Sequence, residues 1–359
     1  MKYMLIEIIK KKLKKSAIFF AYSYSGFIIC YFILKLIFWD RLWIIALITT
    51  FIPLVLFPIF LLPIIGLSII KKRWFSIISA IACIILISWL HIKYFSPKPI
   101  NITNSQPSIK LLSHNLSWYK TQSPTLFKLI HKQQPDLIFL QEIVKKHPKR
   151  TFPSLKADYP YQIGTPPVGI LSKYPIVSSE ILHLAGHPET QQRAIIKFNE
   201  QEVVIYNMQA TGPWFKIYNI LRFLTTPVYK YGPRSPEIQD LVQRVERETL
   251  PVIVAGDFNM TDETQDYYRV QKVMQDSFRK SGFGFGFTWP HGWELKLLVK
   301  SSNWKLNYPV CRIDYIWYSK HWGAKSSSVL EATETDHLPI AAELILLKLS
   351  GISNSINQT

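Results

Sequence analysis

The chain has 359 residues, 48% of them hydrophobic, and a formal net charge of +18. This length exceeds that of one ordinary domain, so a membrane part beside a globular part is allowed. The basic excess suits nucleic acid, anionic lipid headgroups or a phosphorylated substrate, and does not choose among them. Cys311 is the only cysteine after residue 95, which excludes a disulfide within the globular part.

Three apolar runs near the N-terminus predict a membrane anchor. The first run is Ala17–Trp39, which follows a lysine-rich segment at residues 1–15. The second is Trp43–Ile70, and the third extends from Trp74 to about Leu90. Each meets the ~20-residue length that a bilayer core requires. The first run is too long for a secretory signal and leads into further apolar sequence. We expect three transmembrane helices; the alternative is a buried helical hairpin in a soluble protein.

Charges and prolines refine this anchor. The lysines of residues 1–15 and the basic turn at residues 71–73 should stay cytoplasmic, because basic loops are retained on that side. Everything after residue 95 then lies outside, in a multi-pass protein of the cell membrane. Pro53, Pro58 and Pro63 interrupt the middle span, which we expect to be kinked or re-entrant.

A polar stretch, SPKPINITNSQP, separates the anchor from the rest of the chain. It contains prolines and asparagines without an apolar period, which is typical of a linker. The sequence therefore predicts an anchor at residues 1–95, a linker at 96–107, a globular domain at 108–348 and a flexible tail at 349–359.

Short apolar runs that are typical of buried strands alternate with helical stretches in the globular part. The clearest strands are Ile109–Leu112, Leu137–Leu140, Val203–Tyr206, Val252–Ala255, Ile313–Trp317 and Ile340–Leu347. Polar residues lie on or just after several of them, namely Asn115, Glu142, Asn207, Gln209, Asp257, Asn259 and Asp314. Because the ends of strands present chemistry in an α/β scaffold, these residues are site candidates.

Five motifs occur in a fixed order, and one such motif alone would mean little. They are SHNL at 113–116, LQE at 140–142, GDFN at 256–259, RIDYIW at 312–317 and TDHLPI at 335–340. With GILSKYPI at 169–176 and GFTWP at 286–290, the chain resembles the endonuclease/exonuclease/phosphatase superfamily over about residues 108–348. That superfamily includes nucleases, sphingomyelinases and inositol-phosphate phosphatases. The resemblance implies a four-layer α/β sandwich, with two packed β-sheets flanked by helices, and a phosphoester hydrolase.

Hydrolysis of a phosphoester needs a hard cation, a base that activates water, and donors for the developing charge. Glu142 is a natural oxygen ligand for Mg²⁺, which takes few carboxylates and keeps several waters. The resemblance implies that Glu142 binds the metal with help from Asn115 and Asp336. Mg²⁺ is the expected cofactor, with Mn²⁺ as the alternative.

The resemblance also assigns the catalytic residues. It implies that His337 is the general base, oriented by Asp314, and that Asp257 and Asn259 position the nucleophilic water and the phosphate. Asp314 stands on an otherwise apolar strand, where an unpaired carboxylate would be costly to bury. A histidine such as His337 is its expected partner.

The chain departs from the family pattern at one position. Many members have a histidine where this chain has Gln209, in the segment Asn207-Met208-Gln209. The resemblance implies that Asn207 and Gln209 bind substrate. An amide can donate a hydrogen bond to phosphate but cannot act as an acid, so protonation of the leaving group from residue 209 is in doubt.

An aromatic insert extends from Gly212 to Pro233 and contains Lys216, Arg222 and Lys230. Its apolar residues could form one side of an interfacial helix, with the cations toward lipid headgroups. A surface loop packed on the domain is the alternative. A second basic and apolar stretch lies at Trp293–Trp304.

The predicted anchor bears on the substrate. A domain tethered by about a dozen residues meets lipid phosphates at high effective concentration, whereas a processive nuclease gains little from such confinement. Three spans followed by this domain resemble bacterial membrane proteins associated with teicoplanin resistance, which implies a polyprenyl phosphate or diphosphate. We expect a phosphorylated lipid, polyprenyl or phospholipid, as the substrate and the bilayer as a partner. The alternatives are an extracytoplasmic metal-dependent nuclease, since cationic grooves bind phosphodiesters, and a degenerate binding domain.

Overall fold

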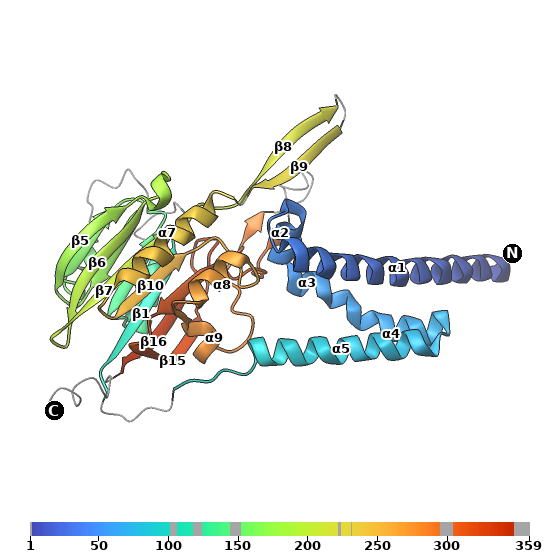
Figure 1. The fold of residues 1–359 in the computed structure, drawn as a ribbon, viewed down its shortest axis with the longest axis horizontal. Coiled ribbons are helices and arrows are strands. Elements are labelled where there is room, and N and C mark those ends of the chain that lie inside the picture. The colour runs from blue at the N-terminus through green and yellow to red at the C-terminus, as the bar shows by residue number, and fades with distance from the viewer. Residues whose placement is uncertain are drawn as a thin grey trace, which may run out of the picture. The chain divides into compact units, whose positions relative to one another are not determined.

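The computed structural model of the chain forms two compact units, Met1–Ser96 and Pro97–Thr359, which are described separately (Figure 1). The structure describes residues 2–100, 106–117, 124–143, 152–221, 224–230, 232–294 and 304–347. The predicted tail at 349–359 lies outside these residues, as do parts of the predicted linker and of the stretch at 293–304.

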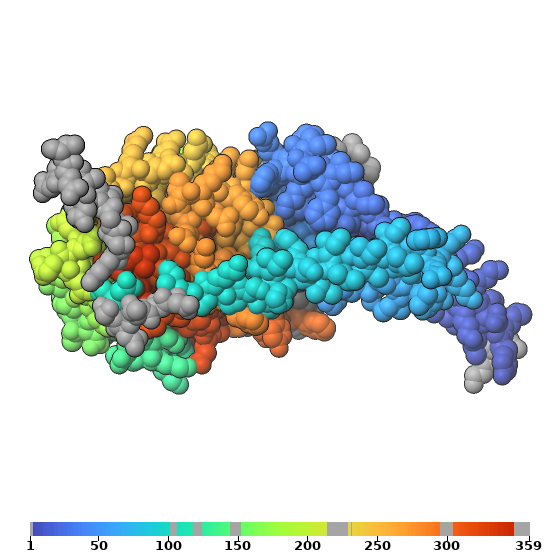
Figure 2. All heavy atoms as spheres, turned by 60° about the horizontal axis from the view of Figure 1, so that its bottom comes forward, coloured from blue at the N-terminus to red at the C-terminus, as the bar shows by residue number. Residues whose placement is uncertain are grey.

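The first unit consists of apolar helices. Three segments are long and apolar enough to cross a membrane: Tyr3–Phe38, Ile52–Ile70 and Arg73–Tyr94. The first lies within α1 (Lys2–Phe38), and the last is α5 (Arg73–Tyr94). Isoleucines of α5 such as Ile78, Ile81 and Ile85 are exposed. Figure 2 draws α5 in cyan with all its heavy atoms. Exposed apolar surface of this extent favours a lipid environment over water. The prediction of three apolar helices is confirmed, whereas their orientation stays a prediction.

The middle segment is broken where the sequence places its prolines. Five short helical pieces follow one another: α2 (Trp43–Thr50), α3 (Ile52–Leu56), η1 (Phe57–Leu61), α4 (Leu62–Ile65) and η2 (Gly66–Ile70). Pro53, Pro58 and Pro63 each stand within the first two positions of a new piece. Proline lacks the N–H that a helix interior needs but is tolerated in a first turn. The hydrogen-bonding pattern of the segment therefore changes at these prolines, and the expected kink or re-entrant path stays a prediction.

Two six-stranded sheets form the second unit. The first has the order β15 (Trp322–Val329), β16 (Ile340–Leu346), β1 (Ser108–Asn115), β2 (Leu137–Gln141), β4 (Val168–Ser172), β3 (Tyr161–Thr165). The second has the order β11 (Gln275–Asp276), β14 (Asp314–Tyr318), β10 (Val252–Asp257), β7 (Gln201–Gln209), β6 (Gln191–Phe198), β5 (Ile176–Leu182). Both sheets are mixed: β1 and β2 run parallel, as do β7 and β10, and the other pairs are antiparallel.

The sheets pack face to face and helices cover their outer faces. Along β1, Ile109 and Leu111 join the core between the sheets, whereas Leu112 joins a cluster with α6 (Pro124–Gln133). Side chains alternate along a strand, so a strand buried on both faces is apolar throughout. On the second sheet, α7 (Arg234–Arg247) and α8 (Gln265–Gln271) supply the outer cluster. The domain is the four-layer α/β sandwich that the motifs predict.

The aromatic insert differs from the expected interfacial helix. It forms an antiparallel hairpin of β8 (Trp214–Leu221) and β9 (Leu224–Lys230). Pro227 lies within the second strand and excludes a continuous helix there. β-Branched residues such as Ile217 and Val228 favour extended backbone. The helix interpretation was wrong for these physical reasons.

The predicted linker is attached to the domain near its start. The Lys98 N–H donates to the Lys280 carbonyl at 2.8 Å, in the short helix α9 (Ser277–Ser281). The Ile100 N–H donates to the Ala324 carbonyl of β15 at 3.4 Å. The segment that is free of the domain after α5 is therefore shorter than the predicted dozen residues.

Candidate active site

The predicted site residues converge because the strands that carry them end at the same edge. In the first sheet, Asn115 at the end of β1 lies beside Gln141 at the end of β2. In the second sheet, Asp257 lies between Gln209 of β7 and Asp314 of β14. Carboxyl ends of parallel strands meet at one edge, so the register alone gathers these groups.

Gly256 permits the close pairing of β10 with β7. Its φ is +144°, and a Cβ built there would lie 2.0 Å from the carbonyl oxygen of Met208. No other residue type fits this backbone, since only glycine lacks the Cβ. The glycine of the GDFN motif thus sets Asp257 against Gln209.

A pocket of about 620 Å³ opens at this edge. Six predicted site residues line it: Glu142, Gln209, Asp257, Asn259, Asp336 and His337. Asn115 and Asp314 are buried behind this lining and are hydrogen-bonded to it. Eight of the nine predicted residues therefore belong to one connected site, and Asn207 is the exception.

Two amides bridge two carboxylates in the wall of the pocket. The Asn115 Nδ2 donates to Glu142 Oε1 at 3.1 Å and to Asp257 Oδ2 at 3.0 Å. The Gln209 Nε2 lies 3.3 and 3.5 Å from the same two oxygens. Neutral donors hold the carboxylates together but do not cancel their charge.

The surplus negative charge changes the titration of these groups. Burial raises the pKa of Glu142, and Asp336 and Asp314 raise it further. Burial, together with the charge of the neighbouring Asp314, raises the pKa of Asp257 to about 8. Carboxylates with raised pKa values bind a proton or a cation readily.

Asn259 holds the other side of Asp257. Its backbone N–H donates to Asp257 Oδ1 at 2.8 Å, and its Nδ2 donates to Asp257 Oδ2 at 3.1 Å and to the Ala210 carbonyl at 2.9 Å. Asn259 has a φ of +51°, which asparagine tolerates better than most residues. Its predicted place beside Asp257 and at the pocket is observed.

One buried polar atom of the pocket has no partner among the described residues. Gln209 Oε1 is shielded from solvent and accepts no hydrogen bond from them. Leaving such an acceptor unsatisfied typically costs about 1–3 kcal/mol. Oxygen atoms from two carboxylates and an amide form a donor set of the kind that Mg²⁺ prefers. The residues present therefore fit a divalent cation.

His337 and Asp314 form a buried pair. The His337 Nδ1 donates to Asp314 Oδ2 at 3.0 Å, which leaves Nε2 for a ligand in the pocket. Burial lowers the pKa of His337, but the charge and hydrogen bond of Asp314 outweigh this and raise the pKa to about 10. Ligand atoms of Asp257, Asp314 and His337 all lie within 4.8 Å of one another.

Asp336 is held by two residues that the sequence did not single out as site residues. Ser117 Oγ donates to Asp336 Oδ1, and Trp289 Nε1 donates to Asp336 Oδ2 at 3.1 Å. The Ser117 N–H also donates to Asn115 Oδ1 at 2.8 Å. Trp289 could have been found from the sequence, because it belongs to the GFTWP motif. For Ser117 the only indication was its position two residues after Asn115.

Asn207 lies beneath the pocket rather than in it. It is fully buried, and its Nδ2 donates to the carbonyls of Leu140 and Gly169, each at 3.0 Å. Its Oδ1 accepts from Gln141 Nε2 at 2.7 Å. These bonds join the two sheets. The predicted role in substrate binding does not fit this position, and Asn207 is a structural link below the site.

Glu237 of α7 ties two segments of the pocket rim together. It is fully buried and accepts hydrogen bonds from His187 Nδ1 at 2.9 Å and from Thr211 N and Oγ1 at 2.7 and 2.6 Å. His187 precedes the lining residue Pro188, and Thr211 lies between the lining residues Ala210 and Gly212. No sequence motif marked this anchor.

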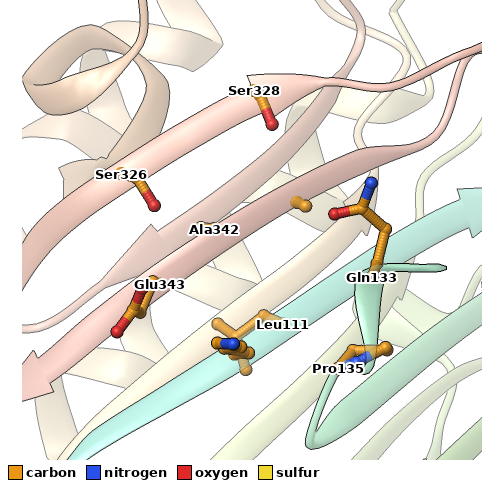
Figure 3. A pocket seen from close by; sticks show the side chains of 9 residues that line it. Leu111, Gln133, Pro135, Ser326, Ser328, Ala342 and Glu343 are labelled. Carbon is orange, nitrogen blue, oxygen red and sulfur yellow. The ribbon is translucent and has the colours of Figure 1, made fainter. Parts of the chain in front are cut away.

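A second hollow, of about 190 Å³, lies on the first sheet between β1, β15 and β16 (Figure 3). Ser326, Ser328 and Gln133 extend over it, and its one carboxylate is Glu343. Glu343 pairs with Lys325 at 2.8 Å. This lining has none of the imidazole and clustered carboxylates of the larger pocket, which is therefore the candidate active site.

Comparisons with known proteins agree with this geometry. The profile of the Endonuclease/Exonuclease/phosphatase family matches residues 112–337. A search of curated proteins found no significant match.

Solved structures with a similar fold share little sequence with the chain. A family protein from Bacteroides thetaiotaomicron is 18% identical, covers 68% of this chain and 100% of its own, and has a TM-score of 0.49. A mannosyl-6-phosphatase from that organism is 17% identical, covers 66% of this chain and 100% of its own, and has a TM-score of 0.47. A truncated TDP2 from Caenorhabditis elegans is 16% identical, covers 66% of this chain and 98% of its own, and has a TM-score of 0.49.

The family profile spans more than half of the chain and includes the strand ends that form the pocket. The chain therefore belongs to the endonuclease/exonuclease/phosphatase family, whose enzymes are divalent-metal-dependent hydrolases of phosphoester bonds.

Proposed function

We propose that the enzyme hydrolyses a phosphate ester or phosphoanhydride of a membrane lipid, polyprenyl or phospholipid, at the outer surface of the cell membrane with Mg²⁺ as its cofactor. The proposal rests on the short segment between the last apolar helix and the catalytic domain. The apolar helix α5 ends at Tyr94, and Lys98 is already bonded to the catalytic domain. Four residue steps span at most about 14 Å. A domain held this close to a membrane end meets lipid phosphates at high effective concentration.

The pocket residues divide the chemistry between them. Glu142 would hold the cation with Asn115 and Asp336, as the family resemblance implies, and Asp257 adds a further carboxylate beside Glu142. When bound, the cation supplies charge neutralisation for phosphate oxygens, acidifies water and offsets the carboxylates that raise the pKa of His337.

His337 acts as the general base in this proposal. Asp314 fixes the imidazole through Nδ1, so Nε2 accepts the proton of the attacking water. Asn259 and Asp257 position that water and the phosphate. The Gln209 Nε2 directs its two N–H donors at Glu142 and Asp257, at 3.3 and 3.5 Å, and would turn one of them to a phosphate oxygen when substrate binds.

Gln209 favours a phosphoanhydride over a simple ester. An amide cannot protonate a leaving group, and an alkoxide leaves poorly without a proton. A phosphate monoester has a second pKa of about 6 and leaves readily as an anion. A lipid diphosphate that loses a phosphate group therefore fits this pocket better than a lipid monophosphate.

The nuclease alternative rests on the net charge of +18. Grooves that bind phosphodiester backbones are lined by lysine and arginine. Among the described residues that line the pocket, none is lysine or arginine, while four are carboxylates: Glu142, Glu189, Asp257 and Asp336. This lining favours a cation-bound phosphate group over a long polyanion.

The test is product release by the detergent-solubilised full chain. The substrates are a polyprenyl diphosphate, a polyprenyl monophosphate, phosphatidic acid and DNA, each with Mg²⁺ and with a chelator. We expect Mg²⁺-dependent phosphate release that is fastest with the diphosphate, and the His337→Ala variant as the negative control. Release of nucleotides from DNA alone would replace this proposal by the nuclease.

A further inference from the structure

A second group of side chains that can bind a metal ion lies at the rim of the pocket. A ring nitrogen of His187 and carboxylate oxygens of Glu189 and Glu237 all lie within 4.8 Å of one another. Glu189 lines the pocket, and Glu237 is fully buried. This group shares no member with the catalytic residues, so it is a separate set of candidate ligands beside the same pocket.

Glu237 is held in the way that metal ligands are held. It accepts three hydrogen bonds, one from His187 and two from Thr211. Its helix, α7, is fixed to the site, because the buried Arg234 at the start of the helix donates to the carbonyl oxygen of Asn259. Hydrogen bonds of this kind orient the ligands of metal sites. A carboxylate has about four acceptor positions, so Glu237 retains one for a cation.

Glu189 has an oxygen that no hydrogen bond satisfies. Its Oε2 is shielded from solvent and has no partner among the described residues. The second carboxylate of the group lies within 4.8 Å, and the group contains no lysine or arginine. A carboxylate buried without a donor or a cation is costly. A cation bound between the two carboxylates and the imidazole supplies the missing partner.

The ligands select the kind of cation. Imidazole nitrogen suits Zn²⁺, whereas Mg²⁺ prefers oxygen ligands. Zn²⁺ binds both nitrogen and carboxylate oxygen at about 2.0–2.2 Å, so ligands across one ion lie about 4 Å apart. The spacing within the group is close to this value. Three protein ligands leave one position of Zn²⁺ open, and a substrate oxygen in the pocket can fill it, because Glu189 lines the pocket.

The order of the strands puts this group on the side of the pocket away from the general base. At the edge of the second sheet, Asp314 of β14, Asp257 of β10 and Gln209 of β7 follow one another. β6 comes next, and the amide of its first residue donates to the Gln209 carbonyl oxygen at 2.7 Å. Glu189 stands two residues before β6. β6 lies two strand spacings, about 10 Å, from β10.

This side is where the leaving group emerges. His337 accepts a proton of water, and the water oxygen bonds to the terminal phosphorus of a diphosphate. The bond from this phosphorus to the bridging oxygen breaks, and its electron pair stays on the lipid monophosphate. In-line displacement places that anion opposite the water, toward Gln209 and Glu189. Without a cation there it would meet a carboxylate, because the described lining has no lysine or arginine.

We propose that His187, Glu189 and Glu237 bind a second divalent cation, Zn²⁺, which holds the lipid phosphate that leaves. The role in the reaction rests on the proposed function, because it needs a diphosphate substrate. The cation site itself does not depend on the substrate. The leaving phosphate then needs no proton, which agrees with the amide at Gln209.

Zn²⁺ binding tests the site without any substrate. The detergent-solubilised full chain is titrated with Zn²⁺ by calorimetry in excess Mg²⁺. Glu189→Gln keeps the size of the side chain and should weaken Zn²⁺ binding about tenfold or more, since even the loss of an outer partner of a ligand costs that much. The matched control, Glu200→Gln, removes a carboxylate that is 87% exposed and should bind Zn²⁺ as wild type does. Unchanged affinity in Glu189→Gln overturns the site.

His337→Ala locates the cation. It removes the imidazole of the catalytic group and should leave Zn²⁺ affinity within about twofold of wild type, as expected for separate sites. Loss of binding in His337→Ala with retention in Glu189→Gln would assign the cation to the catalytic residues and overturn the proposal. Zn²⁺ should also raise the thermal midpoint of wild type but not that of Glu189→Gln. Equal midpoints without Zn²⁺ show that the variant is folded.

The leaving group tests the role in the reaction. In excess Mg²⁺, wild type loaded with Zn²⁺ should hydrolyse a polyprenyl diphosphate about tenfold faster than the zinc-free enzyme, and Glu189→Gln should show no such increase. p-Nitrophenyl phosphate releases an anion that needs no cation, so Zn²⁺ should change its hydrolysis by less than about twofold. Equal acceleration of both substrates, or of neither, overturns the role at the leaving phosphate.

The outcomes separate the cation site from the substrate. If wild type hydrolyses no diphosphate but binds Zn²⁺ through Glu189, the site stands and the proposed substrate fails. If the diphosphate is hydrolysed and Glu189→Gln binds Zn²⁺ as tightly as wild type, the proposed function stands and the cation site fails.

Discussion

The pocket brings together carboxylates that would repel one another in the absence of a cation. Glu142 and Asp257 share the donors of Asn115 and Gln209, and Asp314 lies directly across from Asp257 in the sheet. Burial raises the pKa of Glu142 and of Asp257, neighbouring carboxylates add to the increase, and the amide donors do not reverse it. A divalent cation held by Glu142 would offset this charge.

Separate roles for His337 and Glu142 predict separate defects. His337→Ala should lower turnover about 10²–10⁴-fold, the usual cost of removing a general base, with Mg²⁺ affinity retained. Glu142→Gln should weaken Mg²⁺ affinity, because it removes a charged ligand. Steady-state kinetics and a Mg²⁺ titration by calorimetry distinguish the two variants.

Asp314→Asn serves as the intermediate control. It keeps the imidazole but removes the carboxylate that orients it at 3.0 Å, so its turnover should fall between wild type and His337→Ala. Full activity of both His337→Ala and Glu142→Gln would leave this pocket without a catalytic role.

Gln209→His tests the departure from the family pattern. A histidine at this position can protonate a leaving group, whereas the amide cannot. We expect the variant to gain activity on a lipid monophosphate relative to a diphosphate, measured as the ratio of kcat/KM values. A collapse of both activities would show instead that the hydrogen bonds of Gln209 to Glu142 and Asp257 need the amide.

Strand β10 depends on one glycine for its register. Gly256→Ala would place a Cβ 2.0 Å from the Met208 carbonyl, so β10 and β7 must separate. The variant should be unstable or inactive even though residue 256 contributes no chemistry. Circular dichroism and thermal unfolding show whether the variant is unstable or is folded but inactive. An alanine variant with normal stability and kinetics would refute this account of the motif.

The end of α7 is attached to the second sheet through Glu248. Arg193 of β6 donates to both of its carboxylate oxygens, at 2.7 and 2.9 Å, and the Tyr206 hydroxyl donates at 2.6 Å. Burial raises the pKa of Glu248, but these hydrogen bonds outweigh it and lower the pKa overall.

Glu248→Gln should therefore destabilise the domain by about 1.5–3 kcal/mol, the range for hydrogen bonds to charged groups. Because the folded pKa is lowered, this stabilisation is present above the unfolded pKa of about 4.3 and is lost as the pH falls through the folded pKa. Thermal midpoints in detergent should differ between variant and wild type at pH 7 and converge as the pH falls below the folded pKa of Glu248. A constant difference across this range would show that the charge of Glu248 is not responsible.

The orientation of the whole molecule is a prediction from its basic residues. With residues 1–15 and 71–73 in the cytoplasm, an odd number of crossings places the catalytic domain outside. Protease treatment of intact cells should digest the domain and spare the N-terminal segment, as detected with antibodies to each part. Protection of the domain in intact cells, with digestion after lysis, would reverse the orientation.

The tertiary structure added to or corrected the sequence interpretation where the position of a residue depends on contacts with distant parts of the chain. The anchoring of Asp336 by Ser117 joins residues 219 positions apart. Burial of Asn207 depends on the packing of two sheets, and the attachment of Lys98 depends on α9 lying nearby. The pattern of a single sequence does not show which distant residues will contact each other.

The sequence by itself determined the features that depend on local chemistry. Run lengths and prolines predicted three apolar helices with a broken middle one, because span length and proline geometry are properties of a single segment. Buried strands with polar ends, in motif order, predicted the sandwich. Eight of the nine proposed site residues gather at one edge of it, and their roles stay predictions. Only the tertiary structure decided that the aromatic insert is a hairpin at the rim of the pocket, because strand pairing and the anchors Glu237 and Arg234 come from outside that segment.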